Sequence, residues 1–382
     1  MQFEQYPFEK LQQLLGDVPA LSEKKLIDLT IGEPKFETPN FIQEELIRNS
    51  SLLNKYPKTA GEPKLKLSML GFMQRRFNIT LEVDELIPTF GTREVLFNFP
   101  QFFLHSIANP TMACTNPFYQ IYEGAAIASN AKLHFLNLNL ENSFKPDPQD
   151  ERLKECDLVI INTPNNPTAS VLSLEELSQW VKSSIENNFL LISDECYSEI
   201  YFDEKPPSLL EAARAVGNNN FKNIIVVNSL SKRSSAPGVR SGFIAGDKTI
   251  LKEYMKYRTY IGAASPLPLQ RAATIAWSYD DHVETFRKTY TYNMKLAQDI
   301  LGVKPPKATF YIWLNVKDDK EFTKKLYKEY NVKVLPGSFL GRQNAGEGYI
   351  RIALVESASK TQDALTRIKH CLKSFDLENF ND

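Results

Sequence analysis

The stretch Asn228-Ser-Leu-Ser-Lys232-Arg-Ser-Ser-Ala-Pro-Gly238-Val-Arg240 directly follows an apolar run, residues 224–227, that is typical of a buried strand. It places a lysine among hydroxyl side chains at the end of that strand. An amine is a nucleophile only when its proton is labile. We expect Arg233 and Arg240, together with the desolvation of a closed site, to lower the pKa of the Lys232 ammonium. The stretch therefore predicts a lysine that can form a Schiff base, although the same residues also suit a solvated basic loop.

Arg240 follows Lys232 closely enough along the chain to return to the same pocket. A guanidinium binds a phosphate through two parallel hydrogen bonds, and the hydroxyls of Ser229 and Ser231 could bind the same group. The sequence therefore indicates an anion site beside the lysine.

The pattern Ser229-x-x-Lys232 with Arg240 resembles the lysine segment of the class I/II aminotransferases, which are pyridoxal-phosphate enzymes of fold type I. Seven other motifs of that family occur in its order along nearly the whole chain. They are Ile31-Gly32-Glu33-Pro34, Tyr56-Pro57, Gly91-Thr92-Arg93-Glu94, Asn116-Pro117-Phe118-Tyr119, Asn165-Asn166-Pro167-Thr168, Ser193-Asp194-Glu195-Cys196-Tyr197 and Gly348-Tyr349-Ile350-Arg351. Any one of these motifs is unspecific, but their common order favours an enzyme over the basic loop.

Composition restricts the class of partner. The 382 residues carry 45 Lys and Arg against 46 Asp and Glu, so the net charge of -1 gives no reason to expect a nucleic acid or an anionic membrane. The four cysteines form no C-x-x-C pair and make no ligand spacing with the four histidines, so we expect no metal. Because no apolar stretch approaches the length of a membrane span, we expect a cytoplasmic enzyme of small molecules.

Short apolar runs alternate with amphipathic segments, which predicts an α/β fold with a sheet between helices. We expect strands at residues 86–90, 111–115, 132–136, 158–162, 189–193, 223–229 and 242–246, and helices at 92–105, 118–129, 173–187 and 248–260. From residue 281 the pattern changes to a long charged helix, 281–301, then strands at 310–316 and 349–354 and a helix at 360–375. This C-terminal part is typical of an α+β domain.

The resemblance gives these parts their arrangement. It implies a mostly parallel seven-stranded sheet in a large domain, residues 41–280, that binds pyridoxal 5′-phosphate. Residues 1–40 and 281–382 together are then a small α+β domain that closes over the active site.

Two predicted contacts, at the phosphate and at the ring nitrogen, hold the cofactor. The strand-to-helix turn at Gly91 offers free N-H groups and a helix dipole that suit an anion, although such turns are also common without a ligand. The resemblance implies that the cofactor phosphate binds here, on the backbone of Thr92 and Arg93. Asp194 ends an apolar run, where its carboxylate lies at the carboxyl edge of the sheet. A buried carboxylate needs a cationic partner, and the ring nitrogen of the cofactor supplies it. A helix cap is the alternative role for Asp194.

Further roles come from the resemblance. Tyr119 stacks on the cofactor ring, although packing in the core is the competing interpretation. Tyr197 and Asn166 donate to the ring 3-oxygen, and Ser229 and Arg240 bind the phosphate. Lys232 holds the cofactor and then carries a proton to and from the substrate. The Asn-Asn-Pro-Thr run departs from its commonest form, because Ala169 replaces the usual glycine.

Substrate contacts are predicted in the same way. The planar guanidinium of Arg351 suits the substrate α-carboxylate, and Gly32 and Asn166 are expected beside it. A surface salt bridge is the alternative for this arginine. Tyr56 resembles the tyrosine that reaches the phosphate of the neighbouring subunit, which implies a homodimer with shared sites.

Longer strings narrow the resemblance. Among them, Asn116-Pro-Phe-Tyr-Gln-Ile-Tyr-Glu-Gly124, Asp194-Glu-Cys-Tyr-Ser-Glu-Ile-Tyr-Phe-Asp203 and Tyr257-Arg-Thr-Tyr260 resemble the bacterial N-succinyldiaminopimelate aminotransferases. The substrate of those enzymes carries distal carboxylates, so extra cations are expected in the pocket. Lys35 and Arg258 are the candidates, with plain surface charge as the alternative for each.

Other functions remain open at this point. An aspartate, aromatic or broad-specificity aminotransferase would use the same residues, and so would a β-eliminating C-S lyase. A non-catalytic regulator on the same fold is a different class, but the intact Lys232, Asp194 and Arg351 argue against it.

Overall fold

The computed structural model describes residues 2–375, and residues 1 and 376–382 of the predicted small domain lie outside them. A seven-stranded sheet has the order β2-β8-β7-β6-β5-β3-β4. Its strands are β2 (Leu86–Thr89), β3 (Thr111–Asn116), β4 (Lys132–Asn137), β5 (Leu158–Asn162), β6 (Leu190–Asp194), β7 (Ile224–Ser229) and β8 (Gly242–Gly246). Only β8 runs against its neighbours, so the predicted, mostly parallel sheet is confirmed.

The central strands β5, β6 and β7 are buried along their whole length because helices cover both faces, whereas the edge strand β4 is only partly buried. In β7, Ile224 and Val226 belong to the core on one face, whereas Ile225 and Val227 belong to the core on the other. Successive side chains of a strand point to opposite faces, so a strand buried on both sides reads as one continuous apolar run.

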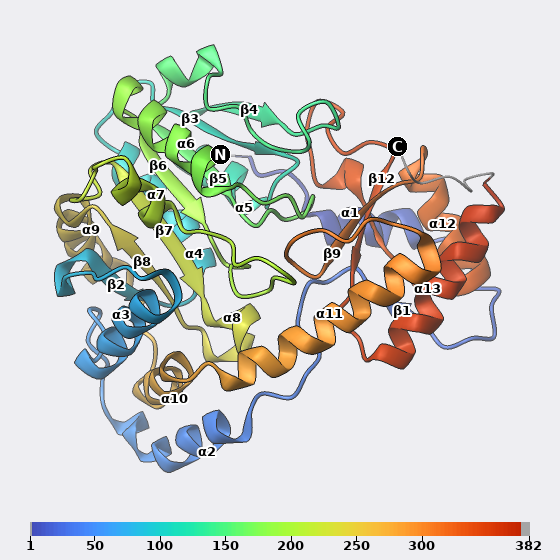
Figure 1. Ribbon diagram of the computed structural model, residues 1–382, viewed down its shortest axis with the longest axis horizontal. Coiled ribbons are helices and arrows are strands. Elements are labelled where there is room, and N and C mark those ends of the chain that lie inside the picture. Colours follow the sequence, from blue (N-terminus) through green and yellow to red (C-terminus); the bar gives the residue numbers. More distant parts are fainter. Residues whose placement is uncertain (1, 376–382) are drawn as a thin grey trace.

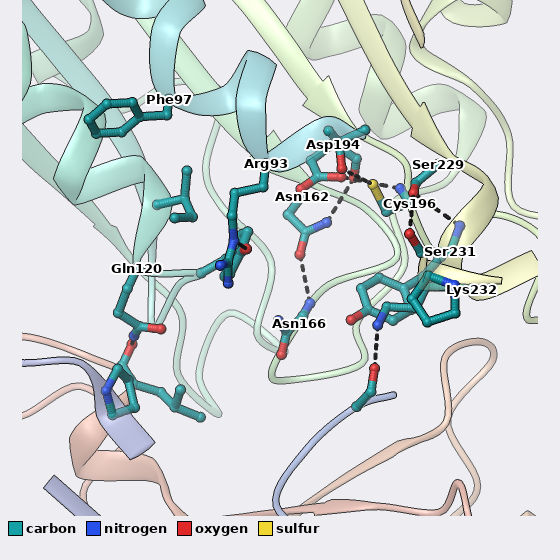
Figure 2. Close-up of a pocket in the computed structure, with 18 of the residues that line it drawn as sticks. Arg93, Phe97, Gln120, Asn162, Asn166, Asp194, Cys196, Ser229, Ser231 and Lys232 are labelled. Carbon is teal, nitrogen blue, oxygen red and sulfur yellow. Dashed lines mark hydrogen bonds between the residues drawn. The ribbon is translucent and has the colours of Figure 1, made fainter. Parts of the chain in front are cut away.

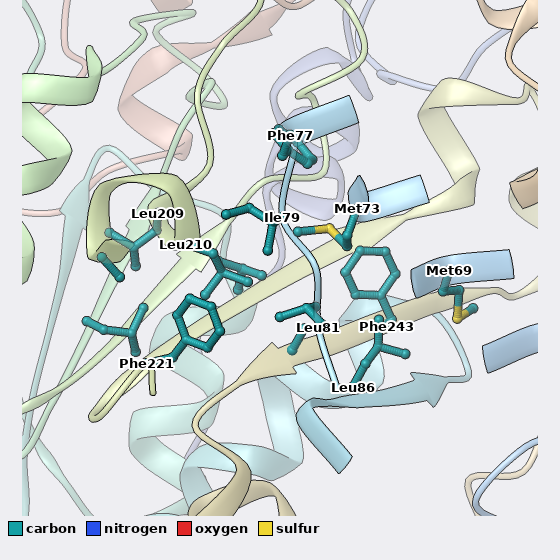
Figure 3. Close-up of a cluster of buried hydrophobic side chains, with 14 of the residues drawn as sticks. Met69, Met73, Phe77, Ile79, Leu81, Leu86, Leu209, Leu210, Phe221 and Phe243 are labelled. Atoms are coloured by element: carbon teal, nitrogen blue, oxygen red, sulfur yellow. The ribbon is translucent and has the colours of Figure 1, made fainter. Parts of the chain in front are cut away.

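The helices of the large unit form two layers (Figure 1). The core on one face draws on α3 (Pro63–Phe77), α6 (Leu174–Asn187), α7 (Leu209–Ala215) and α10 (Leu267–Ser278), and part of it appears in Figure 3. The core on the other face draws on α4 (Thr92–Leu104), α5 (Ile121–Ala128) and α9 (Lys248–Ile261). The first face also carries α2 (Asn40–Arg48), which packs on α10, and α8 (Leu230–Arg233) follows β7 directly.

A second unit contains the sheet β11-β12-β9. Its elements are α11 (Asp281–Leu301), β9 (Tyr311–Asn315), α12 (Asp319–Tyr330), β10 (Val332–Lys333), β11 (Leu335–Pro336), β12 (Tyr349–Ala353) and α13 (Ala358–Lys373). Figure 1 shows α11 running from α10 toward this smaller sheet. Helix α11 has the predicted bounds, and the other predicted elements of this unit shift at their ends.

The N-terminal segment joins the second unit, although it is far away in the sequence. Strand β1 (Ile27–Asp28) pairs with β10, and Ile27 and Leu29 pack in the core of that unit. Helix α1 (Pro7–Leu15) packs against α12 and β11. Short 3-10 helices lie at Ser50–Asn54, Val83–Glu85, Glu151–Glu155, Pro237–Val239 and Gly337–Phe339. The exact boundary between the two units stays a prediction.

The parallel strands bring polar residues to one edge of the large sheet. Asn162, Asp194 and Ser229 are the last residues of β5, β6 and β7, which are neighbours and run parallel. Their side chains therefore gather where ligands bind in open α/β sheets. Within residues 2–375, no helix is both long and apolar enough to span a lipid bilayer.

Candidate active site

A cavity of about 710 Å³ opens at this edge, between the large sheet and the second unit. Its lining contains eleven of the residues predicted to bind cofactor or substrate: Gly32, Thr92, Arg93, Tyr119, Asn166, Asp194, Tyr197, Ser229, Lys232, Arg240 and Arg351. Figure 2 shows Lys232, Asp194, Asn166 and Arg93 pointing into the same space from different elements. Lys35, Tyr56 and Arg258 do not belong to the lining.

Lys232 belongs to the one-turn helix α8, which places its side chain in the wall of the cavity. Ser229 caps that helix, and its hydroxyl accepts a hydrogen bond of 3.2 Å from the backbone N-H of Ser231. The Lys232 ammonium donates to the carbonyl of Gly32. Burial is the main cause that lowers the pKa of Lys232 to about 8, and the charges of Arg351 and Arg240 act in the same direction.

The expected effect of Arg233 on Lys232 is not found. The side chain of Arg233 is 1 % exposed and is directed away from the cavity, toward Asp280, the carbonyl of Ala276 and the carbonyl of Tyr279. It therefore fastens α8, the helix that carries Lys232, to the end of α10 and the start of α11. The next two residues make similar bonds, because Ser234 contacts His282 at 2.7 Å and Ser235 donates to the carbonyl of Phe36.

Asp194 is a buried carboxylate that has no cationic partner among the described residues. It accepts hydrogen bonds from the Tyr122 hydroxyl at 2.7 Å and from the backbone N-H of Cys196 at 3.2 Å. Burial nevertheless raises the pKa of Asp194. Turns and not a helix follow it in the chain, so the helix-cap alternative is wrong. A cation within the cavity would complete this site.

A site that suits an anion lies where α4 begins. Gly91 has a φ of 79°, and a Cβ atom there would lie 2.4 Å from a terminal nitrogen of Arg240. Only glycine allows both this backbone conformation and the close approach of the guanidinium. Arg240 donates to the carbonyls of Pro237 and Phe90, which leaves its charge without a carboxylate. With the free N-H groups of Thr92 and Arg93, this guanidinium suits a phosphate.

The opposite wall carries flat and polar side chains. The Tyr119 hydroxyl accepts a bond of 2.8 Å from Arg93, and its ring meets Tyr122 edge to face. Asn166 is held by Asn162, whose side-chain oxygen accepts from the backbone N-H of Asn166 at 2.7 Å. Asn166 then accepts a bond from Arg351.

Arg351 belongs to β12 of the second unit and is 4 % exposed. Its terminal nitrogens donate to the side chain of Asn166 at 2.7 Å and to the carbonyl of Thr30 at 2.6 Å. These neutral acceptors fix the plane of the guanidinium and leave its charge uncompensated. A planar cation held in this way suits a carboxylate, so the surface salt bridge considered for Arg351 is wrong.

The prediction that Arg258 meets the substrate is contradicted by its surroundings. Its side chain is fully buried, and one terminal nitrogen donates to both oxygens of Glu94, at 2.7 and 2.9 Å. The other donates to the carbonyl of Ala263. The charge of Arg258 is thus balanced inside the fold, because Glu94 on α4 faces α9. Lys35 is exposed and lies outside the cavity.

Several residues of the cavity were not predicted. Asn162 ends an apolar strand as Asp194 does, so the strand pattern contained a signal for it. Tyr6 and Tyr311 carried no such signal, because each reaches the cavity through the folding of a distant segment, whereas Gln120 directly follows the predicted Tyr119. Tyr122 was not singled out in the sequence; its ring is buried, and its hydroxyl donates to Asp194.

Comparisons with known proteins identify the family. A family model described as aminotransferase class I and II matches residues 24–368. The chain belongs to this family. Its enzymes depend on pyridoxal 5′-phosphate and act on amino acids and 2-oxo acids. The uncompensated Asp194, the lysine with a lowered pKa and the phosphate-shaped site at Gly91 all fit this cofactor.

Three relatives show how far the likeness extends. The solved structure of aminotransferase AspB from Helicobacter pylori has 49 % identity and a TM-score of 0.95, covering 97 % of this chain and 99 % of that one. An LL-diaminopimelate aminotransferase from Natranaerobius thermophilus is 33 % identical over 95 % of this chain and 96 % of its own. An aspartate aminotransferase from Pyrococcus horikoshii is 30 % identical over 91 % of both chains.

Proposed function

We propose that this aminotransferase moves an amino group from N-succinyl-LL-2,6-diaminopimelate to 2-oxoglutarate. The products are N-succinyl-2-amino-6-ketopimelate and glutamate, which would place the enzyme in diaminopimelate and lysine biosynthesis. The observation that carries the proposal is a cation in the cavity, Arg93, that has no acidic partner among the described residues. A donor with carboxylates far from its reacting carbon would supply one.

Arg93 is held in place by neutral groups. It donates to the Tyr119 hydroxyl at 2.8 Å and to the Tyr6 hydroxyl at 3.2 Å, so two phenols orient its guanidinium without balancing its charge. Its side chain lies on the far side of Asn166 from Lys232 in Figure 2. We therefore assign to Arg93 the binding of a distal carboxylate, which had been assigned to Arg258 and Lys35.

The names of the relatives bear on the choice of donor. The relative from Natranaerobius is named for LL-diaminopimelate, whose carbon chain is the same as that of the proposed donor. The relative from Pyrococcus is named for aspartate, so an aspartate or broad-specificity enzyme is the second candidate. Aspartate also carries a distal carboxylate, but the space of about 710 Å³ favours a longer donor once the cofactor occupies its part.

The residues of the cavity suggest how the transfer is performed. Pyridoxal 5′-phosphate, when bound, supplies the carbonyl that exchanges the amino group and an electron sink for the reaction. In our proposal the backbone N-H groups of Thr92 and Arg93 and the guanidinium of Arg240 hold its phosphate, Tyr119 covers its ring, and Asp194 keeps its ring nitrogen protonated. Tyr197 and Asn166 hold its 3-oxygen.

Substrate handling falls to three other groups. Arg351 binds the α-carboxylate and so fixes the α-carbon near Lys232. With a pKa of about 8, Lys232 can lose its proton near neutral pH and then take the proton from the α-carbon as a general base. The carbonyl of Gly32 accepts a hydrogen bond from the Lys232 amine in this structure and so holds the amine against one wall of the cavity.

The proposal is tested by comparing kcat/KM for N-succinyl-LL-2,6-diaminopimelate, LL-diaminopimelate, aspartate and alanine, each with 2-oxoglutarate. We expect the succinylated donor to exceed aspartate by about tenfold or more, because a charge-assisted hydrogen bond contributes roughly 1.5 to 3 kcal/mol. Arg93→Leu should remove most of this advantage and leave the low kcat/KM for alanine nearly unchanged, since alanine has no distal carboxylate.

Lys35→Ala is the matched control, because Lys35 is a cation outside the cavity and should leave the order of donors unchanged. Equal efficiency with aspartate and the succinylated donor would establish the broad-specificity enzyme instead. A clear preference for unmodified LL-diaminopimelate would show that this chain uses the donor for which the Natranaerobius relative is named.

A further inference from the structure

Tyr311 connects the second unit to the cofactor side of the cavity. It is the first residue of β9, it is 2 % exposed, and it lines the cavity together with Tyr197 of the large unit. The two hydroxyls lie 2.9 Å apart. Neither hydroxyl has another hydrogen-bond partner among residues 2–375. The contact therefore consists of one hydrogen bond. The positions of the two oxygens do not show which hydroxyl donates it.

Packing fixes where the Tyr311 hydroxyl can point. A Cβ atom on Gly32 would lie 1.8 Å from that hydroxyl, so the absence of a side chain at Gly32 makes room for it. On the other side, Phe310 meets the rings of both tyrosines, with centroids 4.9 Å from Tyr311 and 5.6 Å from Tyr197. The ring of Tyr311 is thus enclosed, and its hydroxyl is held against Tyr197.

A tyrosine hydroxyl has one proton to donate and can accept as well. If Tyr197 donated to Tyr311, it would have no proton for a ligand in the cavity. If Tyr311 donates, the oxygen of Tyr197 is satisfied and its own proton is free to point into the cavity. A bound acceptor selects the second arrangement, because only then do both hydroxyls donate.

We propose that Tyr311 is a positioning residue that donates to Tyr197 and so directs the Tyr197 proton at the bound cofactor. The inference rests on the proposed role of Tyr197. It does not depend on which amino acid supplies the amino group. It also gives the contact between the two units a function, since Tyr311 and Arg351 both come from the second unit and Tyr197 comes from the large one.

The same ring supports the arginine that binds the substrate. The guanidinium carbon of Arg351 lies 4.5 Å from the centre of the Tyr311 ring, within the range of a cation-π contact. Tyr311→Phe removes only the hydroxyl and keeps this ring. The variant therefore separates the effect on Tyr197 from any effect on Arg351.

The test uses binding of pyridoxamine 5′-phosphate to the cofactor-free protein, because this ligand makes no covalent bond with Lys232. We expect Tyr311→Phe to weaken binding about threefold to tenfold, as measured by quenching of protein fluorescence. The KM for glutamate in the loaded variant should stay within about twofold of the parent. Thermal unfolding of the cofactor-free variant shows whether the fold is preserved.

Tyr290→Phe is the matched control. Tyr290 is 2 % exposed and belongs to the same aromatic cluster, but its hydroxyl has no partner among the described residues. Its loss should leave the affinity for pyridoxamine 5′-phosphate unchanged. If Tyr290→Phe and Tyr311→Phe weaken binding equally, the effect is general to the cluster and the proposal is overturned.

A double-mutant cycle completes the test. Tyr197→Phe alone should weaken binding, and a normal affinity in that variant would refute the role of Tyr197 itself. In the Tyr197→Phe background, adding Tyr311→Phe should change the affinity by less than about twofold, because the proton it directs is gone. Fully additive losses would show that Tyr311 acts independently of Tyr197 and would overturn the inference.

Discussion

At the scale of single residues, the site combines charges that the fold leaves uncompensated. Asp194 is buried without a cation, and Arg240 and Arg351 donate only to neutral acceptors. Lys232 lies between these groups with a lowered pKa. Each of these charges costs free energy in the cofactor-free protein, and each becomes favourable when a ligand of opposite charge binds.

The lowered pKa of Lys232 predicts how the stability of the cofactor-free protein depends on pH. Below about pH 8, both the folded and the unfolded chain carry the ammonium, so the cost of burying it is fully present. Between about 8 and the ordinary value of 10.5, the folded chain has lost the proton and the unfolded chain has kept it. The free energy of unfolding should therefore rise through this window.

Lys232→Met is the matched variant, because methionine fills a similar volume without a charge. Urea unfolding of the two cofactor-free proteins should give curves of stability against pH that approach each other as the pH rises from 8 to 10. A constant difference between the two proteins over this range would mean that Lys232 keeps its ordinary pKa.

At the scale of elements, the ion pair between α4 and α9 has a structural role. Arg258 on α9 donates to both oxygens of Glu94, in the first turn of α4, and helix α4 presents its N-terminus to the cavity. Glu94 also accepts bonds from Asn98 and from the backbone N-H of Phe90. This buried network fixes the position of α4, and with it the N-H groups of Thr92 and Arg93.

Arg258→Ala should therefore destabilise the protein and leave the order of preferred donors as it was. Removing one partner of a fully buried pair typically costs about 3 to 5 kcal/mol, and we expect a smaller loss here, because the Glu94 carboxylate is 16 % exposed and lines the cavity. Chemical unfolding measures this loss, and kcat/KM for the succinylated donor and for aspartate measures the preference. Normal stability combined with a changed preference between the two donors would show that Arg258 contacts the substrate after all.

At the scale of the whole molecule, three exposed side chains of the large unit bear on the predicted second copy. Leu53, Tyr56 and Tyr260 are 75, 101 and 91 % exposed, which is unusual for large apolar side chains. Tyr56 does not line the cavity of its own chain. These observations agree with the predicted homodimer, in which Tyr56 serves the cofactor phosphate of the neighbouring subunit.

The homodimer predicts complementation between inactive chains. Lys232→Ala should lose nearly all turnover, because it removes the nucleophile and the proton carrier together. Tyr56→Ala should weaken cofactor binding in the neighbouring site. Mixing the two variants should restore up to about one quarter of the parent activity, since half of the dimers are mixed and each holds one intact site.

Subunit exchange between the two variants is checked by mass spectrometry of differently tagged chains. If exchange is complete and no activity returns, Tyr56 does not act across the interface. Full activity in a monomer at the concentrations of the assay would likewise contradict the predicted assembly.

The sequence by itself determined the sheet and the residues at its edge. Strands buried on both faces read as apolar runs, so residues 158–162 and 242–246 had the predicted bounds, and Asp194 was correctly placed at a strand end. The glycine at Gly91 and the lysine after β7 are likewise local features. Each depends on neighbours in the chain, and for this reason motifs could identify them.

Only the tertiary structure decided which distant charges meet. Arg258 and Arg93 look alike in the sequence, but packing of α9 on α4 neutralises the first with Glu94, whereas the second faces the cavity beside Tyr6. The pairing of Tyr311 with Tyr197 also joins two units that are far apart in the chain. A charge is compensated by whatever lies within a few ångströms, and that distance is set by the fold and not by separation along the sequence.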